Sequence, residues 1–311
     1  MKTRIGHINF PDIIQKAAFL LVLVAFIPGC QKSDSAMISC PSCQCDSPLY
    51  PMTSRIIFSK PWESGLFLLF ENQVLKIRED TQGYGFDLPK YMRWSPDGKK
   101  IAFRSGHGDS IFIIYATGKH ASTPVSGSGE SSCLYPAWSP DGKWIAYCSA
   151  SANEFQIRRV KTDGQDDSLI IRLDGEARAL DWSPDGKRFL CVRRQADADL
   201  NETLIVHIDG FIETDLGVHS EFPRWSPDGK KIVYSNSSVP ILGKTYIMNA
   251  DGSGTVEIAK GIFPDWSADG SQIVYYSSSL FCKRSGFCIV NADGSNPRKI
   301  LDGAGWYADW F

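Results

Sequence analysis

The sequence lacks an excess of either charge. Lys and Arg total 33 and Asp and Glu total 35, so the formal net charge is only −2, and both signs are dispersed along the chain. Because there is no basic stripe, we expect no nucleic-acid partner. The sequence also lacks a Gly-x-Ser-x-Gly elbow and any recognisable Ser, His and Asp triad spacing, which argues against a serine hydrolase.

Long apolar runs are scarce as well. Residues 17–27 form an uninterrupted apolar run of eleven residues, which follows the positive charges of Lys2, Arg4 and Lys16. A membrane-spanning helix needs about 20 residues, so this length instead suits the core of a secretory signal peptide. We therefore predict that residues 1–30 are a signal peptide and that the protein is exported.

The predicted signal peptide ends in "IPGC", which resembles the lipoprotein signal of bacteria. Gly29 and Cys30 fit that pattern, with Cys30 as the lipid-attachment residue, whereas Pro28 departs from it. Gln31 follows the cysteine, and the absence of an aspartate there favours anchoring in the outer membrane, facing the periplasm. The alternative is ordinary cleavage, with Cys30 an incidental residue of a secreted protein.

Residues 31–53 contain Ser, Pro and Cys without hydrophobic periodicity. We expect this segment to be a tether between the membrane and a folded domain. Its cysteines, Cys40, Cys43 and Cys45, have the spacing Cys-x-x-Cys-x-Cys. Three thiols without a fourth nearby ligand favour disulfides within the tether over a metal site.

What the sequence does contain is a repeat of about 44 residues. Its most regular feature is a tryptophan followed by Ser-Pro-Asp-Gly or a close variant. The repeated tryptophans are Trp94, Trp138, Trp182, Trp225, Trp266 and Trp310. Intervals of 41 to 44 residues are typical of one four-stranded blade of a β-propeller.

Each repeat has the pattern of four strands joined by turns. Pro-Asp-Gly after the first strand favours a type I turn followed by a left-handed glycine, and an Asp-Gly pair recurs before the fourth strand in four repeats. The turn aspartates are therefore interpreted as structural rather than as catalytic or calcium-binding residues. The tryptophans are expected where adjacent blades pack, and the apolar second strands are expected to be buried on both faces.

The two ends of the repeat region complete each other. The segment from Arg55 has the second, third and fourth strands of a repeat, and the final "ADWF" has a first strand with nothing after it. We predict that the C-terminal strand completes the N-terminal blade, which leaves no open sheet edge. The expected fold is all-β, a six-bladed β-propeller over residues 54–311.

The motif Trp-Ser-Pro-Asp-Gly-Lys, followed by an apolar strand at this spacing, resembles the TolB-like β-propeller family. The resemblance covers about five-sixths of the chain, with Ala268 in place of proline in the last turn. TolB carries an α/β domain ahead of its propeller, and this chain has only the short predicted tether there. The resemblance therefore implies a propeller-only relative.

Disulfides can persist in the propeller, because an exported protein meets an oxidising compartment, and we expect one between Cys282 and Cys288. Cys282 and Cys288 flank "KRSGF", which we expect to be a hairpin loop of the last blade. If Trp138 pairs with Lys143, Cys133 lies opposite Cys148, and either a cross-strand bridge or two buried thiols would result. Cys191 is expected to be an apolar filler of a core strand.

The predicted function is to bind a protein or peptide of the cell envelope on one propeller face, with no catalysis and no cofactor. We expect the face formed by the loops between strands two and three and between successive blades, because loops vary most. The candidate partner-binding residues are Trp62, Tyr84, His107, Asp109, Glu130, His219, Glu221, Lys283 and Arg284.

Two alternatives belong to other classes. His107 with Asp109 and His219 with Glu221 would be the metal ligands of a carbohydrate-active or lactone-cleaving enzyme, although they match no established ligand spacing. In a glycan-binding module, Trp62 and Tyr84 would instead stack on sugars.

A further set of residues precedes the repeated tryptophans and mixes both signs. Its members are Arg93, Ala137, Asp181, Arg224, Asp265 and Asp309. We expect them to surround the channel, with the arginines paired to aspartates, as a structural charge balance or a polar channel for water or a small ion.

Overall fold

The computed structural model describes residues 55–60, 63–70, 73–78, 90–104, 110–125, 131–151, 154–194, 201–239, 242–278, 285–303 and 308–311. Contacts divide the chain into two units, Met1–Ser47 and Pro48–Phe311, and all described residues lie in the second. The predicted signal peptide, Cys30 and the whole predicted tether lie outside the described residues. Over the described residues, no helix is long and apolar enough to cross a membrane.

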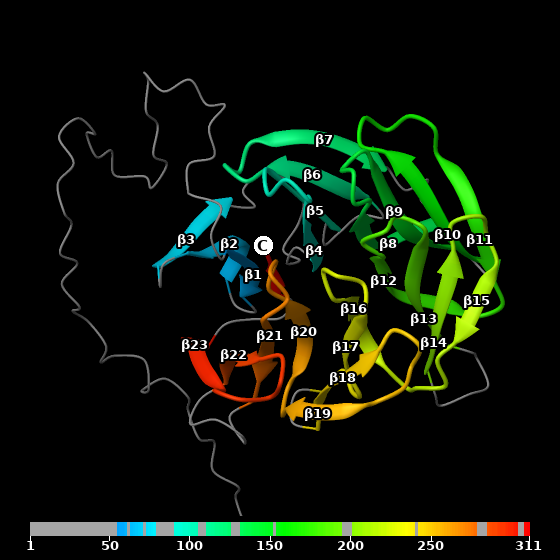
Figure 1. Cartoon of the computed structure of the whole chain (residues 1–311). Helices are drawn as coiled ribbons and strands as arrows, with labels where there is room; N and C mark the ends of the chain where they lie inside the picture. Colours follow the sequence, from blue (N-terminus) through cyan, green and yellow to red (C-terminus); the bar gives the residue numbers. More distant parts are fainter. Residues whose placement is uncertain are drawn as a thin grey trace, which may run out of the picture. The chain divides into compact units, whose positions relative to one another are not determined.

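Six four-stranded antiparallel sheets surround a common centre, so the predicted six-bladed propeller is confirmed (Figure 1). Five blades each use four consecutive strands, with the first strand innermost. In chain order, the first of these blades has β4 (Lys90–Trp94), β5 (Lys100–Arg104), β6 (Ile111–Tyr115) and β7 (His120–Val125), and the second has β8 (Ser131–Trp138), β9 (Trp144–Ser151), β10 (Glu154–Lys161) and β11 (Ser168–Leu173). The third has β12 (Glu176–Trp182), β13 (Arg188–Arg194), β14 (Asn201–His207) and β15 (Ile212–Asp215), and the fourth has β16 (Glu221–Trp225), β17 (Lys231–Ser235), β18 (Thr245–Asn249) and β19 (Val256–Ala259). The fifth has β20 (Ile262–Trp266), β21 (Gln272–Ser277), β22 (Gly286–Asn291) and β23 (Arg298–Asp302).

The sixth blade is built from both ends of the repeat region, as predicted. Its order is β24 (Ala308–Trp310), β1 (Ile56–Lys60), β2 (Glu63–Phe70) and β3 (Gln73–Arg78). Trp310 pairs with Ile56, and the backbones of Arg55 and Phe311 exchange two hydrogen bonds of 2.9 and 2.8 Å. The ring is therefore closed by antiparallel pairing between residues more than 250 positions apart.

The Ser-Pro-Asp-Gly turns adopt the predicted conformation. In the second of them, the Ser139 hydroxyl donates to the Asp141 carboxylate at 2.6 Å and accepts from the backbone N–H of Trp144 at 2.9 Å, while Gly142 is left-handed with φ of 69°. The Ser139 hydroxyl and the backbone N–H of Lys143 lower the pKa of Asp141. These contacts hold the turn together, which explains why the aspartate recurs.

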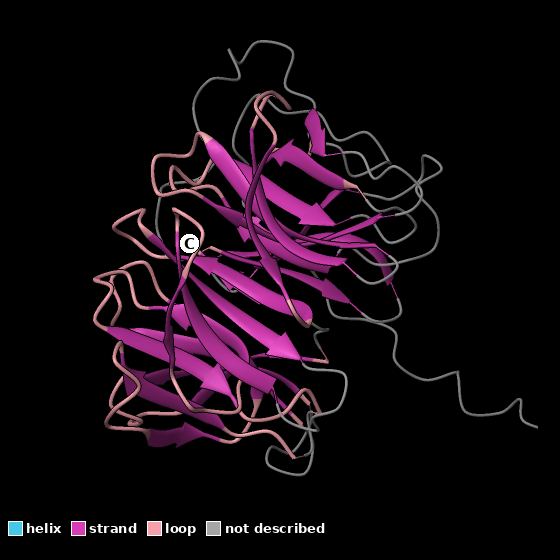
Figure 2. Cartoon of the chain, turned by 90° about the vertical axis from the view of Figure 1, so that its right-hand side faces the viewer, coloured by secondary structure: helices cyan, strands magenta, loops and turns pink. Residues whose placement is uncertain are grey.

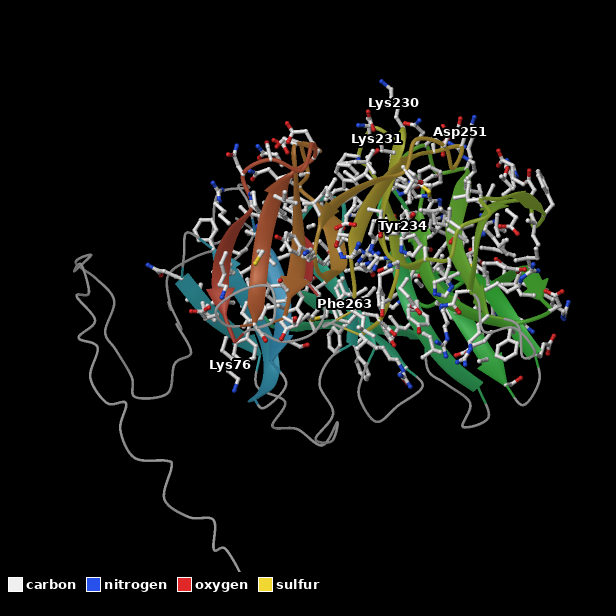
Figure 3. All side chains as sticks on the ribbon, turned by 90° about the horizontal axis from the view of Figure 1, so that it is seen from below. Lys76, Lys230, Lys231, Tyr234, Asp251 and Phe263 are labelled. Atoms are coloured by element: carbon white, nitrogen blue, oxygen red, sulfur yellow. The ribbon has the colours of Figure 1, made fainter. Side chains whose placement is uncertain are left out.

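All five turns of this kind lie on one face of the propeller, which we call the turn face. It carries residues 95–98, 139–142, 183–186, 226–229 and 267–270. Figure 2 shows the strands of the blades running between two opposite faces, with most of the described loops gathered at one of them (left). In Figure 3, Lys230 and Asp251 mark the turn face at the top, and Phe263 lies toward the opposite face.

The repeated tryptophans pack where neighbouring blades meet, as predicted. Trp138 packs with Ile111 and Ile113 of the preceding blade, and Trp225 packs with Leu190 and Ile205 of the blade before it. The tryptophans of the five complete blades are 5–8% exposed. The hydrophobic core is thus a series of clusters between blades, and each blade needs its neighbours to bury its faces.

The predicted pairing of Cys133 with Cys148 is wrong. Trp138 pairs with Ile145 rather than with Lys143, and a bulge before Ala137 shifts the register, so Cys133 lies opposite Ser149. Cys148 is a free thiol, fully buried in a cluster that also contains Cys191. Burial raises the pKa of both thiols, and Cys191 is the apolar filler that we expected. Cys282 lies outside the described residues, so its bridge to Cys288 stays a prediction.

Candidate functional site

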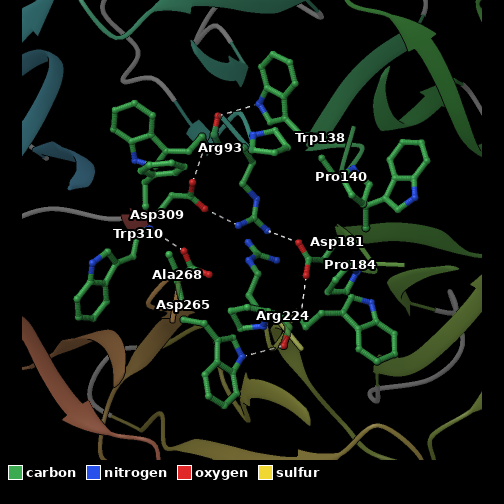
Figure 4. A pocket seen from close by; sticks show the side chains of 18 of the residues that line it. Arg93, Trp138, Pro140, Asp181, Pro184, Arg224, Asp265, Ala268, Asp309 and Trp310 are labelled. Atoms are coloured by element: carbon green, nitrogen blue, oxygen red, sulfur yellow. Dashed lines mark hydrogen bonds and ion pairs between the residues drawn. The ribbon is translucent and has the colours of Figure 1, made fainter. Parts of the chain in front are cut away.

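The innermost strands converge on a polar pocket in the centre of the propeller (Figure 4). Its cavity volume is about 280 Å³. All six residues that precede the repeated tryptophans line it, namely Arg93, Ala137, Asp181, Arg224, Asp265 and Asp309. The sequence prediction that these residues surround the channel is therefore confirmed.

The pocket reaches solvent at the turn face. Its lining includes Pro96, Pro140, Pro184 and Pro227, each from the first position after the serine of a turn, and all four are exposed. Ala268 takes the same place in the fifth turn. Proline and tryptophan rings thus form apolar walls, and the charged side chains lie deeper, along the innermost strands.

Each channel aspartate binds the backbone of another blade. Asp309 accepts a hydrogen bond from the backbone N–H of Trp94 at 2.6 Å, Asp181 accepts one from Trp225 at 2.8 Å, and Asp265 accepts one from Trp310 at 2.8 Å. Because the first strand of a blade has no partner strand on its channel side, a side chain must satisfy this N–H. We call these three contacts the blade latches.

Arg93 neutralises two of the latch aspartates. Its Nη1 lies 2.6 Å from Asp309 and its Nη2 lies 3.2 Å from Asp181. Burial alone would lower the pKa of this guanidinium, but the carboxylates of Asp309 and Asp181 raise it above its usual value. The indole N–H of Trp138 donates to the backbone carbonyl of Arg93 at 3.0 Å, which fixes the strand that carries it.

Arg224 has a different environment. Its Nη1 donates to the carbonyl of Pro223 at 2.9 Å, and within the described residues no carboxylate lies at ion-pair distance from it. Burial and the nearby Arg93 lower the pKa of Arg224 to about 10. Figure 4 shows its guanidinium reaching the centre of the ring, where the Arg93 side chain also ends.

The remaining carboxyl groups are also perturbed. Burial, reinforced by the negative charge of Asp309, raises the pKa of Asp265 well above its usual value. Burial likewise raises the pKa of Asp181, although Arg93 and Arg224 oppose that change. The pocket therefore holds two arginines and three aspartates whose charges compensate each other only in part.

A layer of mostly aromatic residues lies on the innermost strands, on the side of the channel away from the turn face. In five blades the residue three positions before the tryptophan has a left-handed backbone, with φ between 50° and 56°; these residues are Tyr91, Tyr135, Ala179, Phe222 and Phe263. Phe222 and Phe263 are in contact with ring centroids 4.5 Å apart, and Tyr91 packs against their cluster from a blade on the far side of β24. Tyr91 also contacts Tyr135, at 4.1 Å between centroids.

The aromatic layer shares a strained backbone conformation in five blades. A left-handed conformation costs a residue other than glycine of order 1–3 kcal/mol, so its recurrence in five strands marks a constrained feature. The bulges that it produces turn these side chains toward the axis.

Most of the sequence-predicted partner-binding residues lie outside the described part of the chain. They are Trp62, Tyr84, His107, Asp109, Glu130, Lys283 and Arg284. The structure brings the other two, His219 and Glu221, together on Asn201. Nδ1 of His219 accepts the backbone N–H of Asn201 at 2.9 Å, and Glu221 accepts its side-chain amide at 2.7 Å.

In these contacts the side chains of His219 and Glu221 hold Asn201 in place at the start of β14. Glu221 is 9% exposed, and burial raises the pKa of its carboxyl. Within the residues that the structure describes, no group of three or more His, Cys, Asp and Glu side chains is arranged to hold a metal ion. Their predicted role in partner binding stays a prediction.

Sequence reasoning identified the channel residues but did not choose them as a site. The position before each tryptophan could have indicated the site, because it recurs and carries charges of both signs. The local sequence does not show that Arg224 and Arg93 have different partners. The aromatic layer was missed entirely. Its signal, an aromatic residue three positions before the tryptophan in most repeats, is visible in the sequence, but the left-handed conformation that directs these residues inward is not.

Comparisons with known proteins agree with this architecture. The family model described as TolB beta propeller domain matches residues 89–260, which is 172 of the 311 residues. An uncharacterized protein of Agrobacterium fabrum is 32% identical over 207 residues, which cover 61% of this chain and 66% of that protein.

Solved structures share the fold at low sequence identity. TolB from Acinetobacter baumannii superimposes with a TM-score of 0.65 at 18% identity, over 83% of this chain and 66% of that chain. An oligogalacturonate lyase in complex with manganese superimposes with a TM-score of 0.57 at 11% identity, over 81% and 79% of the two chains. This chain thus spans about two thirds of the length of the Agrobacterium relative and of the Acinetobacter TolB.

Proposed function

Since this chain belongs to the TolB β-propeller domain family, we propose that it is an exported scaffold of the cell envelope that binds a protein or peptide partner on one face of the propeller. Binding would be recognition without chemistry. In this proposal residues 1–30 direct export, Cys30 carries a lipid that holds the protein to the outer membrane, and residues 31–53 are the tether.

The pocket at the turn face is the observation that carries this proposal. Tryptophan and arginine are the residue types that dominate protein-binding sites, and a concave opening with apolar walls suits an inserted side chain or chain end. Here proline and tryptophan rings from several blades form the walls, and Arg224 lines the deeper part of the pocket. The closed ring holds these residues in fixed positions, so binding would cost little ordering of the scaffold.

Either of two faces of the propeller could bind the partner. The turn face has the described pocket, surrounded by the exposed Lys143, Lys187 and Lys230. The loop residues predicted from sequence, Lys283 and Arg284 among them, lie outside the described residues, and we expect them on the opposite face. Charge reversal of a rim lysine changes the electrostatic attraction of a partner, so a pair of variants can assign the face.

We would capture the partner by crosslinking in native envelopes. The protein would be compared with Lys187→Glu/Lys230→Glu on the turn face and Lys283→Glu/Arg284→Glu on the opposite face. We expect one partner that is captured by the wild type and lost in the turn-face variant only. Loss of the partner in Lys283→Glu/Arg284→Glu instead would assign the binding site to the opposite face.

Measuring the metal content of the purified protein tests the main alternative, a metal-dependent enzyme. Capture of no partner, together with one tightly bound divalent metal per chain, would contradict the scaffold proposal and favour a metal-dependent enzyme.

A further inference from the structure

Arg224 is the channel charge that the fold does not use. Arg93 binds Asp181 and Asp309, and each of the three aspartates closes a blade latch. In contrast, the guanidinium of Arg224 has a single hydrogen bond, to the carbonyl of the preceding residue, among the residues described. Guanidinium groups have five N–H donors, so most of this donor capacity is directed into the pocket.

Asp265 presents a second group that is only partly satisfied. It is 8% exposed, and its Oδ2 accepts the latch hydrogen bond from Trp310. Its Oδ1 has no hydrogen-bond partner within the described residues. Asp265 and Arg224 occupy equivalent positions on the neighbouring strands β20 and β16, so both face the same part of the pocket.

The electrostatics of this pair favour an anion with acceptor oxygens. Burial and Arg93 destabilise the cation of Arg224 more than Asp181, Asp265 and Asp309 stabilise it, and a negative ligand would add to the compensation by the aspartates. Burial and Asp309 favour the protonated form of Asp265, which has an O–H to donate. An N–H donor and an O–H donor thus converge on the space between the two side chains, and a carboxylate has oxygens to accept from both.

The shape of the pocket restricts how such a ligand can arrive. The rings of Tyr91, Phe222 and Phe263 pack together on the side away from the turn face, whereas the exposed prolines of the lining lie on the turn face. A volume of about 280 Å³ is at the lower limit of ligand pockets, which hold roughly 300–1,000 Å³. The pocket therefore accepts the tip of a ligand rather than a folded segment.

We propose that Arg224 and Asp265 form a carboxylate-binding site at the inner end of the pocket that opens on the turn face. The carboxylate would come from the chain end or an acidic side chain of a bound peptide, or from a small organic acid. Naming a peptide rests on the proposed function, but the carboxylate chemistry does not.

The first experiment compares two ligands that differ only in charge at the tip. N-acetyl-triglycine and its C-terminal amide would be titrated into the full chain, with binding followed by calorimetry or by NMR. A charge-assisted hydrogen bond contributes about 1.5–3 kcal/mol, so we expect the acid to bind at least about tenfold more tightly than the amide. Equal binding of acid and amide, or binding of neither, would overturn the proposal.

Variants locate the preference. Arg224→Gln should remove the preference for the acid, and Arg224→Lys should keep part of it. Arg188→Gln is the matched control, because Arg188 lies on the same side of the propeller, is stacked 5.1 Å from the Trp225 ring and pairs with Asp185 outside the pocket. If Arg224→Gln retains both the preference and the melting temperature of the wild type, Arg224 does not bind the carboxylate. Should Arg224→Gln not fold, the acid and amide comparison on the wild type still decides.

A further arm identifies the source of the carboxylate. Propionate that binds as tightly as N-acetyl-triglycine would support the site and assign it to small acids, whereas much weaker binding of propionate would assign it to peptides. The outcome that overturns the carboxylate site differs from the outcome that overturns the proposed scaffold function. A partner captured equally by the wild type and Arg224→Gln, with no preference for acid over amide, would overturn the carboxylate site and leave the scaffold proposal standing.

Discussion

At the scale of single residues, the channel aspartates combine two roles that usually exclude each other. Each closes a blade latch through one oxygen, which requires an acceptor but not a charge, and each adds negative charge to a buried ring. Arg93 compensates Asp181 and Asp309, and Asp265 is left without a paired cation within the described residues. The buried charge of Asp265 therefore destabilises the folded state, although the hydrogen bond from Trp310 needs only an acceptor oxygen.

This cost predicts a pH dependence. Burial and Asp309 raise the folded-state pKa of Asp265 well above the unfolded value of about 4. A carboxyl that binds its proton more tightly in the folded state stabilises the protein fully below the unfolded pKa, and this contribution is lost as pH rises toward the folded pKa. Asp265→Asn keeps an acceptor for the N–H of Trp310 and removes the charge. We expect its free energy of unfolding in urea, relative to the wild type, to increase as pH rises from 4 to 8.

The control for this prediction is Glu213→Asn, since Glu213 is exposed on the outer strand β15. Its difference from the wild type should stay within about 0.5 kcal/mol. A difference between Asp265→Asn and the wild type that does not change between pH 4 and pH 8 would mean that Asp265 titrates normally.

At the scale of the elements, the turn after the first strand is the most repeated unit of the molecule. Four copies have proline after the serine, and the fifth has Ala268. The backbone of the fifth turn is nevertheless the same, with Gly270 at φ of 70° and its N–H donating to the carbonyl of Ser267 at 2.8 Å. The hydrogen bonds of Ser267 and Asp269 therefore specify the turn without proline.

Ala268→Pro should consequently stabilise the protein. Proline at a compatible position restricts the unfolded chain and contributes about 0.4–1 kcal/mol, which we expect as a small rise in melting temperature. Pro227→Ala in the preceding blade is the reverse change and should lower the melting temperature by a similar amount. A lower melting temperature for Ala268→Pro would show that the fifth turn has a conformation that proline does not tolerate.

At the scale of the whole molecule, ring closure depends on a short strand. β24 has three residues, and the contacts around it include the Asp309 latch to Trp94 and the Asp309–Arg93 ion pair. Beside it, the guanidinium of Arg55 lies 4.8 Å from the Trp94 ring centroid and 4.9 Å from that of Phe311. A side chain from the start of the propeller thus contacts rings from two other segments, and the closure combines backbone pairing with these cation–π contacts.

Deletion of residues 308–311 tests the closure. The deletion leaves β1 as an open edge, leaves the backbone N–H of Trp94 without its acceptor and removes one partner of a buried ion pair. Loss of such a partner alone costs about 3–5 kcal/mol, so we expect a large fall in the free energy of unfolding and rapid proteolysis. A synthetic peptide of residues 304–311 should restore protease resistance when added in trans, and a peptide with Asp309→Ala should restore less. Unchanged stability of the truncated chain would mean that the other five blades fold without closure.

Much of the architecture could be predicted because its determinants are local and repeated. The tryptophan interval, the turn sequence and the complementary ends predicted six blades and their closure, and the structure confirms each of them. The cross-strand register at Cys133 was predicted wrongly, because Trp138 pairs with Ile145 rather than with Lys143, and the bulge at the left-handed Tyr135 reverses only one of the two residues of that shift. A left-handed tyrosine is strained in isolation, and in the folded ring Tyr135 packs against Tyr91 of the preceding blade.

The candidate site divides in the same way. The sequence by itself determined which residues surround the channel, because the position before each tryptophan is fixed by the repeat. Only the tertiary structure decided which of them pair, since Arg93 and Arg224 occupy equivalent positions and differ in the strands that face them across the ring. The same is true of the aromatic layer. Distances across a ring depend on how all six blades pack together, and no local stretch of sequence contains that information.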